Sequence, residues 1–214
     1  MKKILFSAIL LATGFVNAQE IKFGAKLGLN VSNFSGDVTD SKSLIGAQIG
    51  GFAEIAISDK FAIQPELLFS MQGAKTEYSE SDIDYSYSEK SKIKLNYLNI
   101  PVSAKYNLSE KFSLLAGPQF GILMSAKEDF DVSETISGVN DTYSESADVK
   151  DFYKSLVFSF NIGTAYSITE NIYVDARYNL GLSSITKSFT DEFGDSYSAD
   201  IKNNVIQFSV GYKF

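Results

Sequence analysis

Strict alternation of apolar and polar side chains fills the last segment of the chain and continues to its final residue. In VIQFSVGYKF, residues 205–214, every even position from Ile206 to Phe214 is large and apolar, and every odd position from Gln207 to Lys213 is small or polar. Successive side chains of a β-strand point to opposite faces of a sheet. The pattern therefore predicts a strand that separates an apolar medium from a polar one.

The same alternation recurs in seven earlier parts of the chain, each about as long as a strand. One of them changes register next to Tyr97, shortly before Pro101, which predicts a β-bulge there. These segments are residues 21–31, 45–57, 61–73, 94–108, 112–124, 156–168 and 172–183. With the last ten residues they predict eight β-strands.

The connections between these strands are alternately short and long. The three short ones read ISDKF, LSEKF and ITENI, at residues 57–61, 108–112 and 168–172, and they predict tight hairpins of one kind. The four long ones hold most of the Asp and Glu and are expected to be polar loops without helices. They run through residues 32–44, 74–92, 126–154 and 186–203. Short turns at one end and long loops at the other predict an up-and-down antiparallel meander.

An open sheet of eight strands would leave two unpaired edges, which proteins avoid. Closure removes both edges and brings the first and last strands together. The fold class is therefore all-β, a closed eight-stranded antiparallel up-and-down barrel. Its polarity has two versions, because a soluble barrel holds its apolar side chains inside and a membrane barrel holds them outside.

The sizes of the side chains favour the membrane version. An eight-stranded barrel is just wide enough for side chains to fill its interior. Here the polar face is rich in Gly, Ala, Ser, Asn and Gln, which suits a narrow lumen, and the bulky apolar face suits lipid. We therefore expect a transmembrane barrel with short periplasmic turns and long extracellular loops. The alternative is a soluble fold with a core rich in Phe and Tyr.

Charged residues of both signs lie on the polar face of the predicted strands. An isolated buried charge costs several kcal/mol, so we expect these residues to pair inside the lumen and to stabilise the barrel. Glu54 and Glu66 are expected to pair with Lys105 and Arg177, and Arg177 is the best candidate for a bidentate contact. The predicted lumen cluster is Lys26, Glu54, Glu66, Lys105, Asp175 and Arg177.

Aromatic residues of the apolar face gather near the short turns, where an interfacial girdle of a membrane barrel would lie. The predicted interfacial aromatics are Phe23, Phe61, Tyr106, Phe112, Tyr166, Tyr212 and Phe214. The aromatic C-terminus on an amphipathic last strand resembles the signal that the outer-membrane assembly machinery reads. That machinery and outer-membrane lipid are the expected partners.

The N-terminus predicts export from the cytoplasm. Lys2 and Lys3 precede an apolar run that ends at Val16, and small residues occupy the positions before Gln19. The run is too short for the roughly 20 residues that a spanning helix needs. We therefore predict a cleaved signal peptide at residues 1–18 and a barrel domain at residues 19–214.

Composition argues against several functions. The chain has no His and no Cys, so the commonest general base and thiolate chemistry are absent. No pair of nucleophile and base can be assembled, and we predict no enzyme activity, no cofactor and no metal site. The formal net charge of −7 argues against a nucleic-acid partner.

The acidic loops, rich in Tyr and Ser, are interpreted as a solvated surface that keeps the chain soluble during periplasmic transit. Binding of a protein, a polysaccharide or cations by these loops is the alternative. The run from Glu128 to Asp131 suggests calcium, but it lacks the Asp-x-Asp-x-Asp-Gly spacing of a calcium loop.

Three stretches resemble a known family. They are FGAKLGLNVSNFSGD (23–37), GFAEIAISDKFAIQPELLFSMQGAK (51–75) and LNYLNIPVSAKYNLSEKFSLLAGPQFGILMSAK (95–127), of which YLNIP (97–101) with Lys105 and Tyr106 is the most specific part. They are similar to the outer-membrane β-barrel domain of Bacteroidota, a small PorT-like or OmpX-like barrel. The resemblance implies eight strands, a cleaved signal peptide, an outer-membrane location and, for most members, no defined activity.

The expected function is thus a non-enzymatic outer-membrane barrel with a structural or surface-interaction role. Two alternatives stay open. One is an accessory protein of secretion, because some PorT relatives are associated with type IX secretion and gliding. The other is a secreted calycin-like barrel that carries a hydrophobic ligand.

Overall fold

The computed structural model describes residues 21–82, 85–137, 139–190 and 196–214. The predicted signal peptide lies outside the described residues. The elements are β1 (Ile21–Gly36), β2 (Lys42–Ala56), β3 (Phe61–Asp82), β4 (Tyr85–Asn107), β5 (Phe112–Ile136), β6 (Val139–Asp148), the 3-10 helix η1 (Lys150–Phe152), β7 (Leu156–Ser167), β8 (Ile172–Gly181), β9 (Phe189–Thr190), β10 (Ser196–Tyr197) and β11 (Ile201–Lys213). Among the described residues, no helix is long and apolar enough to cross a membrane.

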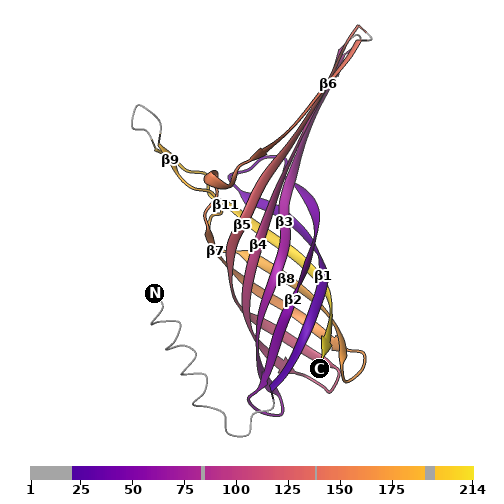
Figure 1. Ribbon diagram of the computed structural model, residues 1–214, viewed down its shortest axis with the longest axis vertical. Helices are drawn as coiled ribbons and strands as arrows, with labels where there is room; N and C mark the ends of the chain where they lie inside the picture. Colours follow the sequence, from indigo (N-terminus) through magenta and orange to yellow (C-terminus); the bar gives the residue numbers. More distant parts are fainter. Residues whose placement is uncertain (1–20, 83–84, 138, 191–195) are drawn as a thin grey trace.

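Within the described residues, eight strands form a closed antiparallel ring. Its order is β1, β2, β3, β4, β5, β7, β8 and β11, and β11 pairs with β1 to close it, from Gly24 opposite Lys213 to Gly36 opposite Ile201. The strands tilt around a barrel, and the C-terminus lies at the end with the short turns (Figure 1). The predicted closed barrel of eight strands, with the first beside the last, is confirmed.

The three short turns share one hydrogen-bond pattern, as their similar sequences predicted. In the first, the Ile57 N–H donates to the Phe61 carbonyl at 2.8 Å, and the Ser58 hydroxyl accepts from the Phe61 N–H at 3.2 Å. Residues 108–112 and 168–172 repeat both bonds, with a Ser or Thr hydroxyl in the same place. A hydroxyl that accepts a local backbone N–H favours a turn over a continuing strand.

The predicted bulge occurs at the expected place, but on the neighbouring strand. The register of β4 against β5 shifts between Asn96, opposite Ser125, and Tyr97, opposite Leu123, so Met124 of β5 is the extra residue. The alternation of β4 itself continues, because Leu95 and Tyr97 are buried in an apolar cluster inside the barrel. Near Tyr97 the residues of β4 are apolar at odd and at even positions. The odd ones are buried in the cluster inside the barrel and the even ones lie on the outer wall, so the strand itself does not slip.

The prediction of polar loops at residues 74–92 and 126–154 is wrong over most of their length. β3, β4 and β5 continue beyond the barrel wall, and β6 pairs with β5 along its whole length. Figure 1 shows these strands rising as one narrow sheet above the barrel. The backbone groups of these segments pair with neighbouring strands, which satisfies their hydrogen bonds. Their Tyr, Thr and Val residues favour extended chain, so the segments form strands without an apolar face. The 3-10 helix η1 also lies in this region, where no helix was expected.

The barrel is polar inside and apolar outside. Phe120, Phe158 and Leu180 point outward and are 45%, 37% and 43% exposed, whereas Glu66 and Arg177 are each 3% exposed in the lumen. A soluble carrier of a hydrophobic ligand requires the opposite arrangement. The structure therefore contradicts the calycin-like alternative and the soluble apolar core.

Candidate functional site

Four buried charges cross the middle of the lumen and form what we call the central charge cluster. It consists of Lys26 on β1, Glu66 on β3, and Asp175 and Arg177 on β8. Lys26 Nζ lies 2.6 Å from Asp175 Oδ2 and 3.3 Å from Glu66 Oε2, and Arg177 Nη2 lies 2.6 Å from Glu66 Oε1. The four side chains are at most 1% exposed. Two cations and two anions make the cluster neutral, which is what burial in a closed lumen requires.

Glu66 is the centre of this cluster. It accepts hydrogen bonds from Arg177 and from Lys26, and Gln64 Nε2 donates to its Oε1 at 2.8 Å. The contact from Arg177 to Glu66 uses one guanidinium nitrogen, and Arg177 Nε lies 3.4 Å from Asp175 Oδ1 instead. Arg177 therefore bridges two carboxylates and does not make the bidentate contact with one carboxylate that the sequence suggested.

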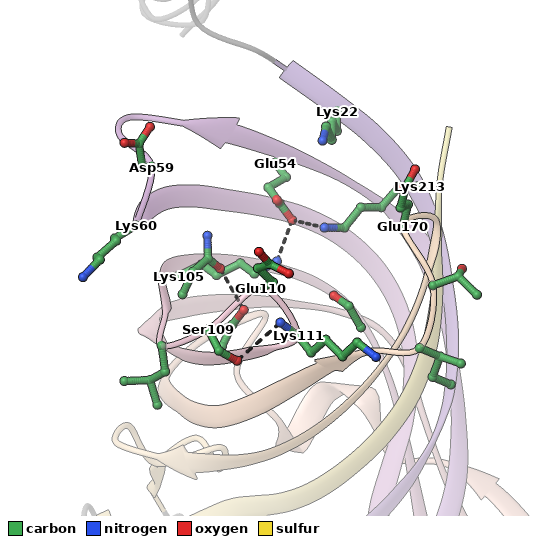
Figure 2. A pocket seen from close by; sticks show the side chains of 16 residues that line it. Lys22, Glu54, Asp59, Lys60, Lys105, Ser109, Glu110, Lys111, Glu170 and Lys213 are labelled. Carbon is green, nitrogen blue, oxygen red and sulfur yellow. Dashed lines mark hydrogen bonds and ion pairs between the residues drawn. The ribbon is translucent and has the colours of Figure 1, made fainter.

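A second group, the mouth trio, lies nearer the short turns. Glu54 Oε2 accepts from Lys105 Nζ at 2.8 Å and lies 2.9 Å from Lys213 Nζ. The trio lines a cavity of about 710 Å³, together with residues of the short turns (Figure 2). Both ammonium groups lie about 6 Å from the Tyr173 ring centre, at 6.0 and 5.7 Å, within the range of a cation–π contact.

The predicted lumen cluster is thus divided between these two groups. The structure brings Glu66 together with Arg177 and Glu54 together with Lys105, and it adds Lys26 and Asp175 as bridging charges. Sequence reasoning missed Lys213 as the second partner of Glu54. Its odd position on the last strand, on the same face as Gln207 and Ser209, was the available signal.

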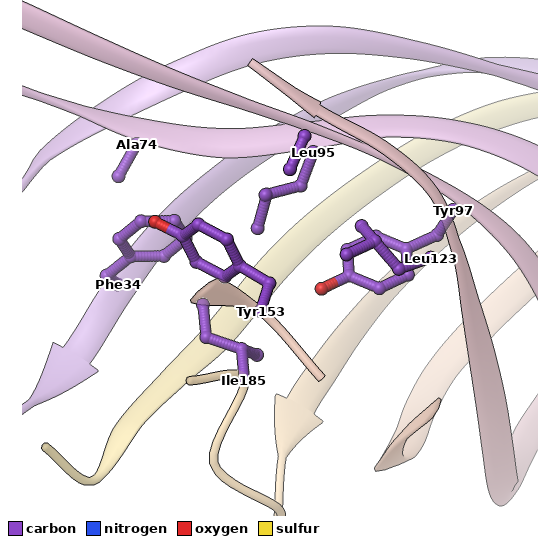
Figure 3. Packing of buried hydrophobic residues seen from close by; sticks show 8 residues of the cluster. Phe34, Ala74, Leu95, Tyr97, Leu123, Tyr153 and Ile185 are labelled. Atoms are coloured by element: carbon purple, nitrogen blue, oxygen red, sulfur yellow. The ribbon is translucent and has the colours of Figure 1, made fainter. Parts of the chain in front are cut away.

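The other end of the lumen is closed by an apolar cap of buried side chains. Tyr153 and Ile185 come from the segments that follow β6 and β8, and they fold inward over the barrel (Figure 3). Burial raises the pKa of the Tyr153 hydroxyl to about 12. A cavity of about 20 Å³ below the cap is the size of one water molecule. The cap comprises Phe34, Ala74, Leu95, Tyr97, Leu123, Ala126, Tyr153 and Ile185.

The predicted interfacial aromatics all lie at the short-turn end of the outer wall. Phe23 and Phe214 are the most exposed of them, at 61% and 75%. Neighbouring rings form pairs, with centres 4.7 Å apart for Phe61 and Tyr106. Tyr212 and Phe214 form a second pair, and Phe112 stands opposite Tyr166 on the adjacent strand.

The sheet above the barrel, which we call the blade, has two chemically different faces. It consists of residues 73–82, 85–94, 127–136 and 139–148, and its strands pair without a register shift. Residues directly opposite on paired strands share a face, and alternate residues along a strand share a face. The face that contains Ala74 continues the inner wall of the barrel, since Ala74 belongs to the cap. The other face continues the outer wall.

The inner continuation is the Tyr/acid face. Its Tyr hydroxyls donate to carboxylates two residues along the same strand, as Tyr78 does to Glu80 at 3.2 Å and Tyr87 to Glu89 at 2.8 Å. These hydrogen bonds raise the pKa of Tyr78 and of Tyr87. The described rows of this face hold no Lys or Arg, and they carry Glu80, Asp82, Glu89, Glu128, Glu134, Asp141 and Glu145 with the rings of Tyr78, Tyr85, Tyr87, Phe130 and Tyr143.

The outer continuation is the lysine face, on which Ser and Thr separate the charges and no aromatic residue occurs in the described rows. Its charged residues are Lys75, Glu77, Lys90, Lys92, Lys94, Lys127, Asp129, Asp131 and Asp148. Asp129 pairs with Lys94 and accepts from Ser146, and the hydrogen bond from Lys94 lowers the pKa of the Asp129 carboxyl.

The calcium interpretation of Glu128 to Asp131 does not fit this geometry. The segment is part of strand β5, so Glu128 lies on the Tyr/acid face while Asp129 and Asp131 lie on the lysine face. Their side chains do not converge on one point. In the part of the chain that the structure describes, no group of three or more carboxylates is arranged to hold a metal ion.

Comparison with known proteins identifies the family. A family model for the outer membrane protein β-barrel domain matches residues 17–187. The chain belongs to this family. It is an outer-membrane β-barrel, and the apolar outer wall is accordingly its lipid-facing surface.

Solved structures with a similar fold share little sequence with the chain. The crystal structure of Ail, the attachment invasion locus protein of Yersinia pestis, is 13% identical, covers 91% of this chain and 99% of its own, and has a TM-score of 0.42. Neisserial surface protein A is also 13% identical, with coverages of 90% and 97% and a TM-score of 0.49. A major outer membrane protein from Thermus thermophilus is 12% identical, with coverages of 91% and 100% and a TM-score of 0.43. No curated protein matches the chain.

Proposed function

We propose that this chain is a non-enzymatic outer-membrane barrel that holds the blade at the cell surface, where the Tyr/acid face binds a basic polypeptide. The observation that carries the proposal is that the described rows of the Tyr/acid face hold seven carboxylates and no Lys or Arg, while the lysine face holds charges of both signs. In this proposal the chain is exported by a signal peptide at residues 1–18 and belongs to the PorT-like small barrels, which the YLNIP stretch at 97–101 supports. The short turns then lie in the periplasm and the blade lies outside the cell.

The filled lumen supports a role outside the barrel over a role as a pore. The central charge cluster crosses the lumen at its middle, and the apolar cap occupies its surface end. An ion that moved through would have to displace paired charges and then enter a layer of buried Leu and Tyr side chains, and both steps oppose transport. We expect the purified protein to show no conductance steps in planar bilayers.

The chemistry of the Tyr/acid face suits Lys and Arg side chains. Carboxylates attract the charged groups, and exposed aromatic rings bind cations through their faces. Aromatic side chains also supply large contact areas at a small cost in conformational entropy, as binding surfaces generally use them. Tyr78 and Tyr87 pack with ring centres 6.3 Å apart across β3 and β4, which forms a platform in the middle of the face.

Two matched variants of the full-length protein test the proposal. The first neutralises three acids of the Tyr/acid face, as Glu80→Gln/Glu89→Gln/Glu134→Gln. The second makes the same change of net charge on the lysine face, as Glu77→Gln/Asp129→Asn/Asp131→Asn. Binding of a fluorescent oligolysine peptide is measured in detergent at about 0.15 M salt, where charges more than about 8 Å apart are largely screened.

We expect the first variant to bind the peptide at least about threefold more weakly, since each lost contact with an exposed charge is worth roughly 0.2 to 1 kcal/mol. The second variant should stay within about twofold of the wild type. An equal loss of affinity for the peptide in both variants would show that only the net charge of the protein matters and would contradict the proposal. Binding of a neutral polysaccharide that is as strong as that of the peptide and is lost in Tyr78→Ser/Tyr87→Ser would also contradict the proposal, because the rings would then bind a sugar.

A further inference from the structure

The lower part of the lysine face combines an unusual arrangement of charge with a position next to lipid. Lys42 of β2, Lys75 of β3 and Lys92 of β4 stand directly opposite one another in one row across three strands. In the next row towards the barrel, Lys94 of β4 stands directly opposite Lys127 of β5. We call these five residues the lysine rows.

Like charges directly opposite on neighbouring strands destabilise a sheet. Two carboxylates offset part of this repulsion, since Glu77 lies 2.8 Å from Lys42 and 3.5 Å from Lys75, and Asp129 pairs with Lys94. Asp129 stands directly opposite Lys92, and Asp148 stands directly opposite Lys127. Among the described residues, neither carboxylate lies within ion-pair distance of these two lysines, since Asp129 pairs with Lys94 instead. The rows therefore keep a positive excess on a chain whose net charge is −7.

The height of the rows follows from the outer wall below them. The lipid-facing residues of β3 run from Phe61 to Met71, which are 51% and 46% exposed. Ten residue steps at about 3.3 Å each, on a strand tilted by about 40°, span roughly 25 Å along the barrel axis, the usual height of the apolar band of an outer-membrane barrel. The lysine rows begin two residues beyond Met71, about 5 Å higher, and reach about 10 Å above the band. That is the layer of lipid headgroups.

The bulge in β5 contributes to this placement. Phe120, Ile122 and Met124 point outward at even positions, and the extra residue shifts the outward positions to odd numbers. Lys127 consequently faces outward beside Lys94, while Glu128 turns to the Tyr/acid face. If the register of the lower part of β5 continued without the shift, Ala126 would stand opposite Lys94 and Lys127 would face inward.

We propose that the lysine rows bind the phosphate groups of the lipid that forms the outer leaflet. A phosphate accepts hydrogen bonds from several ammonium groups and removes the repulsion between opposed lysines. The rows continue the lipid-facing wall, so the anion that reaches them first is part of the lipid itself. Basic residues just beyond the apolar band bind anionic headgroups in other membrane proteins for the same reason. This inference concerns the opposite face of the blade from the Tyr/acid face and does not depend on the ligand of that face, but it rests on the proposed orientation with the blade outside the cell.

The test uses Lys92→Gln/Lys127→Gln, which breaks no ion pair, and the control Lys60→Gln/Lys111→Gln, which removes two exposed lysines from the short turns. Thermal unfolding of each full-length protein is followed by gel mobility in zwitterionic phosphocholine micelles. It is repeated after addition of bisphosphorylated lipid A, dephosphorylated lipid A, or inorganic phosphate. Native mass spectrometry counts the retained lipids.

We expect lipid A to raise the unfolding temperature of the wild type and the control alike, and to be retained at least about tenfold less by Lys92→Gln/Lys127→Gln. In neutral micelles the same variant should be about as stable as the wild type, because the substitutions remove both the repulsion between opposed lysines and the attraction of Asp129 and Asp148. An equal shift with dephosphorylated lipid A or with inorganic phosphate would overturn the assignment of lipid phosphate. Undiminished retention by the variant, or an equal loss in the control, would overturn the assignment of the site.

Discussion

The central charge cluster makes a prediction that depends on its neutrality. Replacing Arg177 with Met leaves Glu66 and Asp175 facing only Lys26, so the lumen holds one excess negative charge. Replacing Glu66 with Gln leaves Lys26 and Arg177 facing only Asp175, so the excess is positive. Combining the two changes restores neutrality and keeps the pair between Lys26 and Asp175 at 2.6 Å.

The expected free energies follow from this count of charges. Removing one partner of a buried ion pair costs about 3–5 kcal/mol, mostly because the other charge is left without a partner, whereas replacing both partners by neutral groups of similar volume is often close to neutral. Each single variant should therefore lose about 3–5 kcal/mol of unfolding free energy. The double variant should lose less than the sum by at least about 2 kcal/mol, as expected for residues in direct contact. Met and Gln retain most of the side-chain volume, which limits the contribution from cavities.

The assay is urea-dependent folding into lipid vesicles, with the folded fraction read from the mobility of unheated samples on a denaturing gel. The chain has no Trp, so Tyr fluorescence is the second signal. Lys202→Met serves as the control, because Lys202 pairs with Asp200 at 3.0 Å on the exposed surface, where a pair contributes at most about 1 kcal/mol. Additive single losses, or a loss below about 0.5 kcal/mol for Arg177→Met, would refute the argument that the cluster stabilises the barrel through paired charge.

Three further predictions concern other parts of the chain. Gly73→Ala should lower the urea midpoint by the equivalent of roughly 1–3 kcal/mol, because Gly73 has φ of +140° and an added Cβ would lie 1.9 Å from the Ile93 carbonyl oxygen. Tyr153 has a pKa raised from 10.0 to about 12 by burial, so its contribution to stability is full below pH 10 and is lost as the pH rises from 10 to 12. Tyr153→Phe should therefore lose less stability than the wild type over that interval, as urea midpoints at each pH would show. N-terminal sequencing of the protein from outer membranes should begin at Gln19, and an intact Met1 would contradict the predicted signal peptide.

The barrel was predictable from the sequence because its walls separate two media. Phe120 and Phe158 must meet lipid while Glu66 must not, so the period of two is enforced along every strand of the ring. The short turns were equally clear, because the same hydroxyl at Ser58, and at residues 109 and 169, supplies the same local acceptor. Physical constraints that act residue by residue leave a visible pattern.

The pairing inside the lumen was only partly predictable. The sequence placed Glu66 and Arg177 on the polar face, but which charges meet depends on the stagger of strands that are not neighbours, such as β3 and β8. Lys213 was not predicted as a partner of Glu54, because the alternation of the last strand shows only that its side chain lies on the polar face. A count of charges would not have found it, because the predicted lumen cluster already balances three cations against three carboxylates without Lys213.

The blade was mistaken for loops for a physical reason. Above the membrane both faces of a sheet meet water, so the contrast between apolar and polar positions disappears although the strand continues. The remaining signal was finer, since Tyr85 and Tyr87 alternate with Ser86 and Ser88 in one strand. Such a pattern predicts extended chain when β-propensity is weighed without hydrophobicity.

The division of charge across the blade is not explained by folding or solubility. A sheet that only had to stay soluble would mix both signs on each face, because mixing lowers the repulsion between neighbours. Here the continuation of the inner wall carries seven carboxylates and no Lys or Arg in the described rows, whereas the continuation of the outer wall carries five lysines with four carboxylates. Each arrangement adds repulsion within its own face, as Lys75 opposite Lys92 shows. Sorting of this kind is favourable if the two faces meet different neighbours, which is what we propose: lipid phosphates beside the outer face and a basic polypeptide at the inner one.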